Sequence, residues 1–322
     1  MFFVTHRKVF YTIIAALLVA CVGVLMYPGL RFGIEFVGGS MVEVRYEGER
    51  PEKNTLESQL AALGLGSVSL RASGDNNYLL RTQSLEEGAM PSVLEALSTE
   101  GNTATLDRSA TIGPVIGGEM QKKAFVAIFL VMVAIILYVA FAFREKTPEN
   151  EAQDVRKKNE QEKEAPPVSS WTYGLIAIMV LLHDMLVPLG VVAVLGLVAG
   201  LEVDVLIVMA LLTILGYSVN DTIVIFDRVR ERMLKNKESH REETFAETVG
   251  TALSQTYTRS INTSFTTLVV VVSLLVFGGS TTTYFALVLA VGVFAGTYSS
   301  LALAAPLLVS VHEYVEKKRE VA

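Results

Sequence analysis

Six apolar segments, each close to or above the length of a membrane-spanning helix, dominate this sequence of 322 residues. They are Phe10–Tyr27, Ala124–Phe143, Tyr173–Ala199, Val205–Phe226, Ile261–Phe277 and Tyr284–Val311. A helix needs about 20 apolar residues to cross the hydrocarbon core of a bilayer. The composition agrees, because only 19% of the residues are charged, whereas soluble domains carry about 25%. The sequence therefore predicts an α-helical polytopic membrane protein with six transmembrane helices.

The distribution of basic residues predicts the orientation. Of the 27 Lys and Arg residues, 18 lie in the N-terminus, in 144–170, in 228–259 and in the C-terminal tail, and the short connections 200–204 and 278–283 contain none. Short loops rich in Lys and Arg stay in the cytoplasm, so both termini are predicted to be cytoplasmic. The predicted parts are 1–28, the N-terminus and first helix; 29–123, an extracytoplasmic domain; 124–143, the second helix; 144–172, a charged cytoplasmic loop; and 173–322, helices three to six with an amphipathic cytoplasmic segment at 228–259.

The first apolar segment admits a second interpretation. Residues 18–21 resemble the box at which a lipoprotein precursor is cleaved, with Cys21 as the modified residue. Mostly apolar residues continue after Cys21 as far as Tyr27, however, so the segment is long enough to remain as a span. We therefore interpret Cys21 as a small residue packed in a helix.

The predicted extracytoplasmic domain alternates between two hydrophobic periods. Period-two alternation and β-rich composition predict strands at 40–46, 67–72, 78–82 and 103–110, and helical spacing predicts helices at 52–63 and 86–97, the second with acidic residues in its first turn. The order β-α-β-β-α-β is that of the ferredoxin-like split βαβ fold. The domain contains no catalytic cluster in its sequence, so we interpret it as a docking surface.

The two long cytoplasmic segments differ in pattern. Residues 144–167 alternate acidic, basic and amide side chains and end in two prolines, a composition that cannot bury a core and predicts a solvated charged hairpin. In 228–259, apolar residues recur every four positions at Phe245, Val249, Leu253 and Tyr257. That spacing predicts an amphipathic helix lying along the membrane face.

Enzyme and cofactor motifs are not recognised in the sequence. The net charge of −6 offers no basic surface for nucleic acid. The segment 33–40 has the outline of a phosphate-binding loop, but Gly39 stands where the lysine is required, so no ATP binding is expected. The four histidines and the single cysteine are too scattered to predict a metal site. We expect no cofactor, no bound metal and no enzymatic activity.

Ionisable residues inside apolar spans are costly and indicate function by default. Asp221 lies about 8 Å inside the cytoplasmic end of the fourth span, at about 1.5 Å of rise per residue from Phe226. One arc of this span is polar, whereas the opposite side is apolar. The residues of the polar arc are Thr213, Gly216, Tyr217, Asn220, Asp221, Asp227 and Arg228.

The fifth span has a matching polar face. Its residues Arg259, Asn262, Thr263, Thr266 and Ser273 recur at spacings of three, four and seven. If the two spans are antiparallel neighbours, Arg259 comes near the depth of Asp221, because an arginine side chain reaches several ångströms along the helix. A carboxylate with a movable arginine partner can bind and release a proton. The alternative is a static structural ion pair.

The third and sixth spans carry further features. His183 and Asp184 lie near the middle of the third span, where adjacent residues point about 100° apart and are not expected to pair with each other. They form either a second proton site or a polar contact between helices. In the sixth span, Gly292 and Gly296 form a small-xxx-small face that predicts close helix packing.

Three motifs also resemble one known family. Residues 216–231, GYSVNDTIVIFDRVRE, are very similar to the signature of SecF proteins in the SecD/SecF family of bacterial protein-export membrane proteins. The motif after the first span, with Phe32, Gly33, Glu35, Gly38 and Gly39, and the fifth-span motif 259–267 resemble the same family, as does the pair His183 and Asp184. The family departs from this chain in two respects: it usually has Asp where Glu35 stands, and its charged loop is shorter.

The resemblance implies a role in export. It places the chain in the bacterial cytoplasmic (inner) membrane, among proton-driven exporters of the resistance–nodulation–division type. It implies a proton relay of Asp221 and Arg259, with Asn220 beside them, and the other intramembrane polar residues as secondary positions: His183, Asp184, Asp227, Arg228, Asn262 and Thr266. The implied partners are a SecD-like subunit, the SecYEG channel, an exported unfolded polypeptide and protons.

Two other functions remain open from the sequence. A proton-driven exporter of small molecules or lipids would use the same relay, but it would need a substrate pocket and typically twice as many spans. A scaffold without a proton path would hold a partner and would tolerate Asn at position 221.

The predicted topology is testable with reporter fusions. A reporter that is active only outside the cytoplasm should be active when fused after residue 75 and silent when fused after residues 155, 237 and 322, because basic loops stay inside. An active fusion after residue 155 would contradict the six-span topology.

Overall fold

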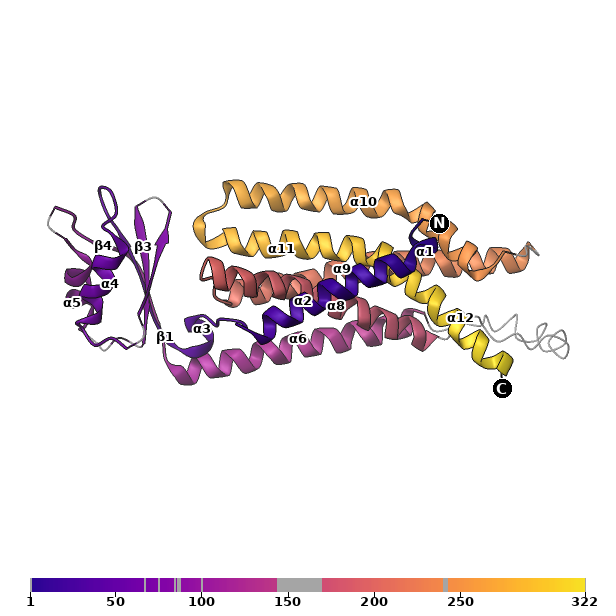
Figure 1. Ribbon diagram of the computed structural model, residues 1–322, viewed down its shortest axis with the longest axis horizontal. Coiled ribbons are helices and arrows are strands. Elements are labelled where there is room, and N and C mark those ends of the chain that lie inside the picture. The colour runs from indigo at the N-terminus through magenta and orange to yellow at the C-terminus, as the bar shows by residue number, and fades with distance from the viewer. Residues whose placement is uncertain are drawn as a thin grey trace.

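The computed structural model describes residues 2–66, 68–74, 76–83, 85, 88–99, 101–143, 170–239 and 243–321. Six helices in these ranges are long and apolar enough to cross a membrane, which confirms the predicted polytopic architecture. A small sheet domain lies at one end of the helix bundle (Figure 1). Most of the predicted charged loop, residues 144–169, lies outside the described residues.

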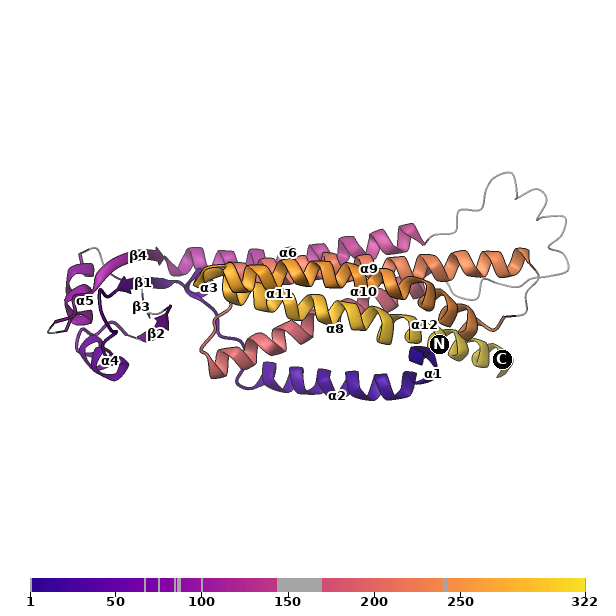
Figure 2. The same cartoon turned by 90° about the horizontal axis from the view of Figure 1, so that it is seen from above.

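The helices of the bundle are longer than the apolar segments that predicted them. They are α2 (Arg7–Met26), α6 (Pro114–Ala142), α8 (Ser170–Val198), α9 (Val205–Glu238), α10 (Phe245–Phe277) and a sixth span made of α11 (Ser280–Ser299), the π-helix η1 (Ser300–Ala304) and α12 (Ala305–Val321). A one-turn helix, α1 (Phe2–Thr5), precedes α2. Both chain ends lie in the half of the molecule opposite the sheet (Figures 1 and 2).

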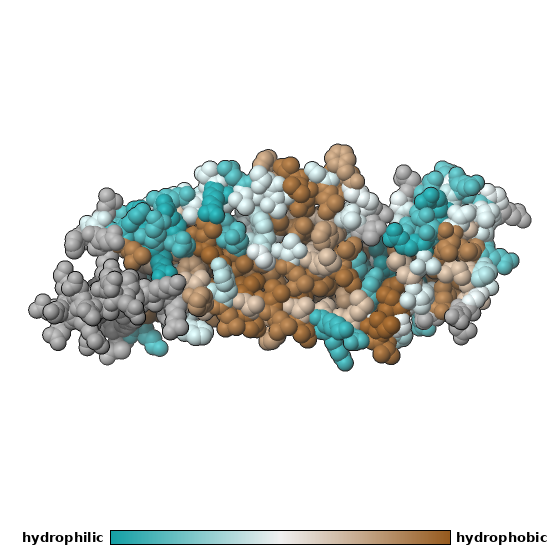
Figure 3. Space-filling model, turned by 180° about the vertical axis from the view of Figure 1, so that it is seen from behind, coloured by the Kyte–Doolittle hydropathy of each residue, from teal (hydrophilic) through white to brown (hydrophobic). Residues whose placement is uncertain are grey.

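Three spans form the interior of the bundle and three form its exterior. In their most apolar stretches, 56% of the residues of α8, 44% of those of α9 and 61% of those of the sixth span are buried, compared with 11%, 6% and 17% in α2, α6 and α10. Hydrophobic side chains cover the middle of the molecule, and hydrophilic ones gather at its two ends (Figure 3). This distribution fits an apolar bilayer core between two aqueous surfaces.

The segment 228–259 is not a separate amphipathic helix on the membrane face, so that prediction is wrong. Its first part continues α9 as far as Glu238, and its second part begins α10 at Phe245. Val249 and Leu253 are buried in the helix bundle. Four-residue spacing identifies an apolar helix face but not what covers it, and here protein rather than lipid covers most of it.

The sheet domain has the predicted ferredoxin-like topology. Its elements are β1 (Gly39–Arg45), α4 (Lys53–Ala61), β2 (Ser69–Ser73), β3 (Asn77–Thr82), α5 (Met90–Leu97) and β4 (Thr105–Ile112). The sheet order is β2-β3-β1-β4, with every neighbouring pair antiparallel. Both helices lie on the face of the sheet turned away from the bundle (Figure 1). This is an α+β arrangement in which non-consecutive strands are neighbours.

Alternating strand residues and the two helices form one core. Val42, Val44 and Leu80 are fully buried, and the Tyr46 hydroxyl donates a hydrogen bond of 2.8 Å to the Leu97 carbonyl. Burial raises the pKa of Tyr46 to about 12. The helix α5 begins at Met90 rather than at 86 and has no acidic residue in its first turn. Residues 86–87, where the acidic turn was predicted, lie outside the described residues.

The sheet domain is joined to the bundle through the motif after the first span. Gly33 N–H donates to the Val203 carbonyl at 2.8 Å, and Val203 N–H donates to the Arg31 carbonyl at 2.7 Å. Phe32 thereby forms a parallel bridge to Val203 in the connection between α8 and α9. Arg81, on β3, adds an ion pair with Glu202 of the same connection.

Two glycines of this motif are required by their backbone. Gly38 has φ +80° and Gly39 has φ +134°, conformations that residues with a Cβ rarely adopt. A Cβ on Gly38 would lie 2.7 Å from the Pro114 Cα at the start of α6, and one on Gly39 would lie 2.6 Å from the Thr82 carbonyl oxygen. Because they lack a Cβ, the two glycines allow the chain to pass from α3 (Ile34–Val37) into β1 while it lies close to the backbones of Pro114 and Thr82.

Substitution of Gly39 tests this requirement. Gly39→Ala should destabilise the sheet domain by about 1–3 kcal/mol, because the new Cβ adds strain at positive φ as well as a clash. Gly48→Ala is the matched control, since its Cβ would meet only Asn102 Oδ1 at 3.8 Å. Thermal unfolding and protease resistance of the purified protein measure both variants. Equal stability of the two variants would contradict the assignment.

Candidate functional site

Asp221 lies on α9, where serines from two other elements donate to its two oxygens. The Ser260 hydroxyl of α10 donates to Asp221 Oδ1 at 2.5 Å, and the Ser300 hydroxyl of η1 donates to Oδ2. Both serines are buried, whereas Asp221 is partly exposed. Two hydroxyl donors satisfy hydrogen-bonding groups that the carboxylate would otherwise leave unpaired in an apolar region. The site thus joins three of the six spans at one ionisable group.

Arg259 has the predicted depth but not a contact with Asp221. Its neighbour Ser260 touches the carboxylate, yet Arg259 is exposed and, in the described part of the chain, forms no ion pair or hydrogen bond with Asp221. Adjacent helix residues point about 100° apart, so one faces the interior and the other the surface. The relay role of Arg259 stays a prediction.

A second carboxylate, Asp184 on α8, is fully buried. His183 Nδ1 lies 2.7 Å from Asp184 Oδ1, so the expectation that these neighbours do not pair is wrong. Rotation about the side-chain bonds of His183 brings its imidazole close to the Asp184 carboxylate, and the spacing of residues along a helix does not predict such a rotation. Asp184 Oδ2 accepts hydrogen bonds from Ser218 of α9 and, at 2.8 Å, from Ser299 at the end of α11.

The histidine extends this cluster to the sixth span. His183 Nε2 lies 2.8 Å from the Tyr298 hydroxyl, and the two rings meet edge to face. If Nδ1–H donates to Asp184, the neutral imidazole must accept from Tyr298 at Nε2. His183 and Asp184 are therefore part of a polar cluster that joins α8, α9 and α11.

A third group of hydroxyls joins α9, α10 and α11. Tyr217 and Thr297 both donate to Ser264 Oγ, at 2.9 and 2.7 Å, and Ser264 donates to the Ser260 carbonyl at 2.8 Å. This group lies next to the Asp221 site, because Ser260 belongs to both. Close packing supports it: a Cβ on Gly292 would lie 2.1 Å from Ile214, which confirms the predicted small-residue packing face.

Sequence reasoning missed most of the side chains that hold these carboxylates. The missed residues are Ser218, Ser260, Tyr298, Ser299 and Ser300. A signal was present, because consecutive serines are unusual in an apolar run and Ser260 adjoins Arg259 in the fifth-span motif. Serine is common in membrane helices for several reasons, however, and only the packing identifies the partner of each hydroxyl.

Other predicted residues form an exposed polar strip on α9 and α10. The strip consists of Gly216, Asn220, Arg259, Asn262, Thr263 and Thr266, all of them exposed. Thr266 donates to a carbonyl of its own helix, that of Thr263, at 2.9 Å. Polar side chains at this depth in a span are costly against lipid, so another protein surface is expected to cover the strip.

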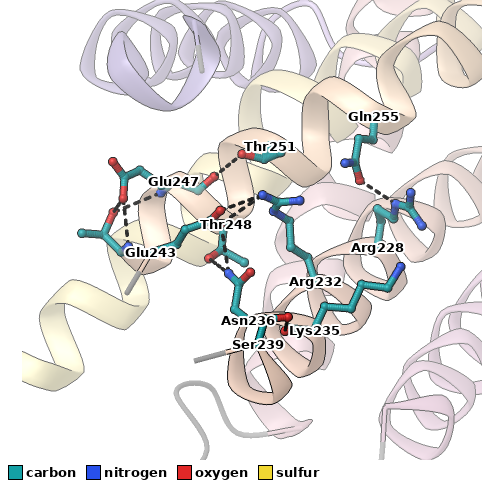
Figure 4. Close-up of polar contacts among 11 residues, drawn as sticks. Arg228, Arg232, Lys235, Asn236, Ser239, Glu243, Glu247, Thr248, Thr251 and Gln255 are labelled. Atoms are coloured by element: carbon teal, nitrogen blue, oxygen red, sulfur yellow. Dashed lines mark hydrogen bonds and ion pairs between the residues drawn. The ribbon is translucent and has the colours of Figure 1, made fainter. Parts of the chain in front are cut away.

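Asp227 and Arg228 lie beyond this strip, where α9 continues towards the α9–α10 hairpin. Asp227 is exposed, and Arg228 Nε donates to Gln255 Oε1 at 2.8 Å. Farther along, Arg232 pairs with Glu243 at 2.8 Å, and Asn236 donates to both Glu243 and Thr248 at 3.0 Å (Figure 4). These contacts hold the ends of α9 and α10 together and do not include Asp221.

Thr244 and Glu247 form a capping box at the start of α10. The Thr244 hydroxyl accepts from the Glu247 N–H, and the Glu247 carboxylate accepts from the Thr244 N–H. A reciprocal cap of this kind satisfies two backbone donors that the helix leaves unpaired. It explains why α10 begins sixteen residues before the apolar segment that predicted the span.

Glu35 lies at the junction between the sheet domain and the bundle, far along the chain from both carboxylates. One of its carboxylate oxygens lies close to the Gly33 backbone, where a Cβ would approach it to 2.5 Å. Burial lowers the pKa of the Arg81 guanidinium, and the charge of Glu35 opposes that shift. Burial also raises the pKa of the Asp204 carboxyl, whereas the hydrogen bond from the Ile207 N–H and the charge of Arg81 act in the opposite direction. This junction is therefore a partly buried cluster of opposite charges.

In the described ranges, no three His, Cys, Asp or Glu side chains gather where they could hold a metal ion. The geometry instead consists of two carboxylates in apolar spans, each held by hydroxyls from neighbouring helices. Ionisable groups placed in this way inside membrane spans mark a candidate functional site.

Comparisons with known proteins identify the family of the chain. A family profile described as "Protein export membrane protein SecD/SecF, C-terminal" matches residues 93–150 and 169–314, and one described as "SecD/SecF GG Motif" matches residues 28–49. The protein translocase subunit SecF of Thermobaculum terrenum is 34% identical over 95% of this chain and 92% of its own length. SecF of Pseudomonas aeruginosa is 32% identical over 95% of this chain and 90% of its own length.

A solved structure gives the same result. The crystal structure of SecDF, described as a translocon-associated membrane protein from Thermus thermophilus, matches 97% of this chain with a TM-score of 0.80 and 30% identity. The chain spans 39% of the length of that SecDF chain. The chain therefore belongs to the SecD/SecF family of protein-export membrane proteins, a family of translocase subunits.

The hairpin contacts of Figure 4 are testable by hydrogen exchange. Arg232→Ala should speed exchange in residues 243–250, because its pair with Glu243 is only 20% and 23% exposed and holds the start of α10. Lys235→Ala is the control, since its pair with Glu231 is 64% and 43% exposed, and such exposed pairs contribute about 0–1 kcal/mol. Equal exchange in both variants would show that the Arg232 pair does not hold the hairpin.

Proposed function

We propose that this chain is a SecF-type subunit of the bacterial Sec protein-export machinery and that proton movement past Asp221 assists the translocation or release of an exported polypeptide. The observation that carries the proposal is the position of Asp221. It is an ionisable residue in an apolar span, held by hydroxyls of Ser260 and Ser300 from two other helices and only partly exposed. The proton-motive force supplies the energy in this proposal.

Protonation of Asp221 changes its hydrogen bonding. The carboxylate only accepts hydrogen bonds, whereas the protonated acid has an O–H donor on one oxygen. One of the two serine hydroxyls must then turn away or accept. Because Ser260 and Ser300 belong to α10 and the sixth span, the gain or loss of one proton alters the contacts of α9 with both helices.

The helix α9 also connects Asp221 to the outside domain. Asp221 lies 16 residues from the first residue of α9, Val205, or about 24 Å at about 1.5 Å of rise per residue. The connection just before Val205 is the one that bridges to Phe32 and pairs with Arg81. We expect a shift of α9 to move this connection and the sheet domain attached to it.

The exposed polar strip on α9 and α10 supports a membrane partner. We propose that a SecD-like subunit covers it and that Arg259 acts in this covered interface as the movable partner of Asp221. In the SecDF protein of Thermus thermophilus, a segment resembling this chain is part of a longer chain. The further partners that we propose are the SecYEG channel, the unfolded polypeptide and protons.

The proposed location is the bacterial cytoplasmic membrane, with both termini in the cytoplasm and the sheet domain outside. The sheet domain then meets the emerging polypeptide. We expect no covalent chemistry in this cycle, because proton binding and helix movement are sufficient for it.

Neutralisation of Asp221 tests the proposal. Export into vesicles should be stimulated by a proton gradient in the wild type, and Asp221→Asn should abolish that stimulation at unchanged abundance, because Asn keeps the shape but does not titrate. Arg259→Lys should retain part of the stimulation, since Lys keeps the charge but lacks the forked contact of Arg.

Asp227→Asn is the matched control, because Asp227 is an exposed aspartate of the same helix. It should keep most of the stimulation. Normal gradient-dependent export by Asp221→Asn would refute the relay and favour a scaffold. Failure of that variant to accumulate would identify Asp221 as a structural residue.

A further inference from the structure

Two consecutive serines in the sixth span contact the two intramembrane carboxylates separately. Ser299 ends α11 and donates to Asp184 on α8 at 2.8 Å, and Ser300 begins η1 and donates to Asp221 on α9. Adjacent residues of a helix point in different directions, which allows one dipeptide to reach two neighbouring helices. Both serines are fully buried.

Each of these serines has a second acceptor within reach. Ser299 Oγ lies 3.1 Å from the Gly296 carbonyl oxygen, and Ser300 Oγ lies 2.9 Å from the Thr297 carbonyl oxygen. A hydroxyl has one hydrogen to donate. Each serine can therefore direct that hydrogen either to a carboxylate on another helix or to a carbonyl of its own helix.

The backbone at this point is also irregular. Residues 300–304 form a π-helix that packs against α2, α8 and α9. Short π-helical segments inside α-helices occur frequently at functional sites, and this one begins at Ser300, directly after Ser299 ends α11. The segment lies in the interior, since all five of its residues are buried.

We propose that Ser299 and Ser300 are positioning residues that couple the two carboxylates, so that the protonation state of Asp221 is transmitted to the cluster of Asp184 and His183. This inference rests on the proposed function of Asp221. When Asp221 is ionised, Ser300 donates to it. When Asp221 takes up a proton, Ser300 donates to the Thr297 carbonyl instead, the π-helical segment shifts, and the bond from Ser299 to Asp184 changes with it.

Other ionisable side chains surround this pair on α2, α8, α9, α10 and α11. His183 on α8 contacts Asp184, Tyr298 on α11 contacts His183, and Cys21 on α2 packs near Tyr298. Tyr217 on α9 donates to Ser264, and Arg259 on α10 precedes Ser260 without contacting Asp221. Tyr298 is hydrogen-bonded to His183 and immediately precedes Ser299. A shift of the dipeptide therefore also reaches the histidine through Tyr298, and His183 reports on the whole cluster.

The coupling can be measured at His183 without export. The full chain, with isotope-labelled histidine, is placed in lipid bilayers, and the ring-nitrogen resonances are recorded by solid-state nuclear magnetic resonance, with His183→Gln assigning the His183 signals. Asp221→Asn imitates the neutral state and should shift them. Ser300→Ala should shift them in the same direction, because it also removes the Ser300 bond to Asp221.

Two further variants complete the test. Asp227→Asn removes an exposed carboxylate from the same helix and should leave the His183 signals unmoved. In a Ser299→Ala background, Asp221→Asn should shift them much less than in the wild type. Unchanged His183 signals in Asp221→Asn and Ser300→Ala, an equal shift in Asp227→Asn, or an undiminished shift in the Ser299→Ala background would each overturn the coupling.

The outcome is separable from that of the proposed function. If Asp221→Asn abolishes gradient-dependent export but leaves His183 unchanged, only the coupling fails. If it shifts His183 but exports normally, the relay fails and the coupling remains as a structural property of the bundle.

Discussion

An ionised carboxylate in an apolar region is costly unless hydrogen-bond donors surround it, and the arrangement of the inner helices depends on this constraint. Asp184 receives its donors from its own helix, from α9 and from α11. Asp221 receives them from α10 and η1. Two carboxylates thus constrain how α8, α9, α10 and the sixth span face one another, because each hydroxyl must lie at the depth of the acid that it binds.

The two carboxylates differ in their access to the surface. Asp184 is fully buried beside His183, whereas Asp221 is partly exposed and next to the polar strip of α9 and α10. An acid at the boundary between a buried network and a polar surface can exchange a proton and still be linked to the interior. This difference explains why we assign proton uptake to Asp221 and a responding role to Asp184.

The same physical principle, satisfaction of polar groups between neighbouring elements, also acts at the start of α9. Two backbone hydrogen bonds at Val203 and the ion pair of Arg81 with Glu202 fasten the sheet domain to the connection before α9. The close backbone approaches that Gly38 and Gly39 permit reinforce this junction. The helix α9 therefore carries Asp221 near its midpoint and meets the sheet-domain junction at its start, which is the geometry that our proposed mechanism needs.

Much of the architecture could be predicted from the sequence because it depends on local patterns. Apolar length predicts the six spans, and period-two and helical spacing predict the order of strands and helices in the sheet domain. The predicted helix starts are misplaced where a proline or a capping box decides them, as at Pro91 and Thr244. Asp221 was recognisable because a charge in an apolar run is costly wherever the helix packs.

Tertiary structure alone decided the partners of these residues. Ser260 rather than Arg259 contacts Asp221, His183 turns back onto Asp184, and the face of Val249 and Leu253 packs in the protein rather than on lipid. A sequence pattern defines which side of a helix is polar or apolar, but the rotation of each helix against its neighbours determines which side chain meets which, and that rotation results from the packing of all the spans together.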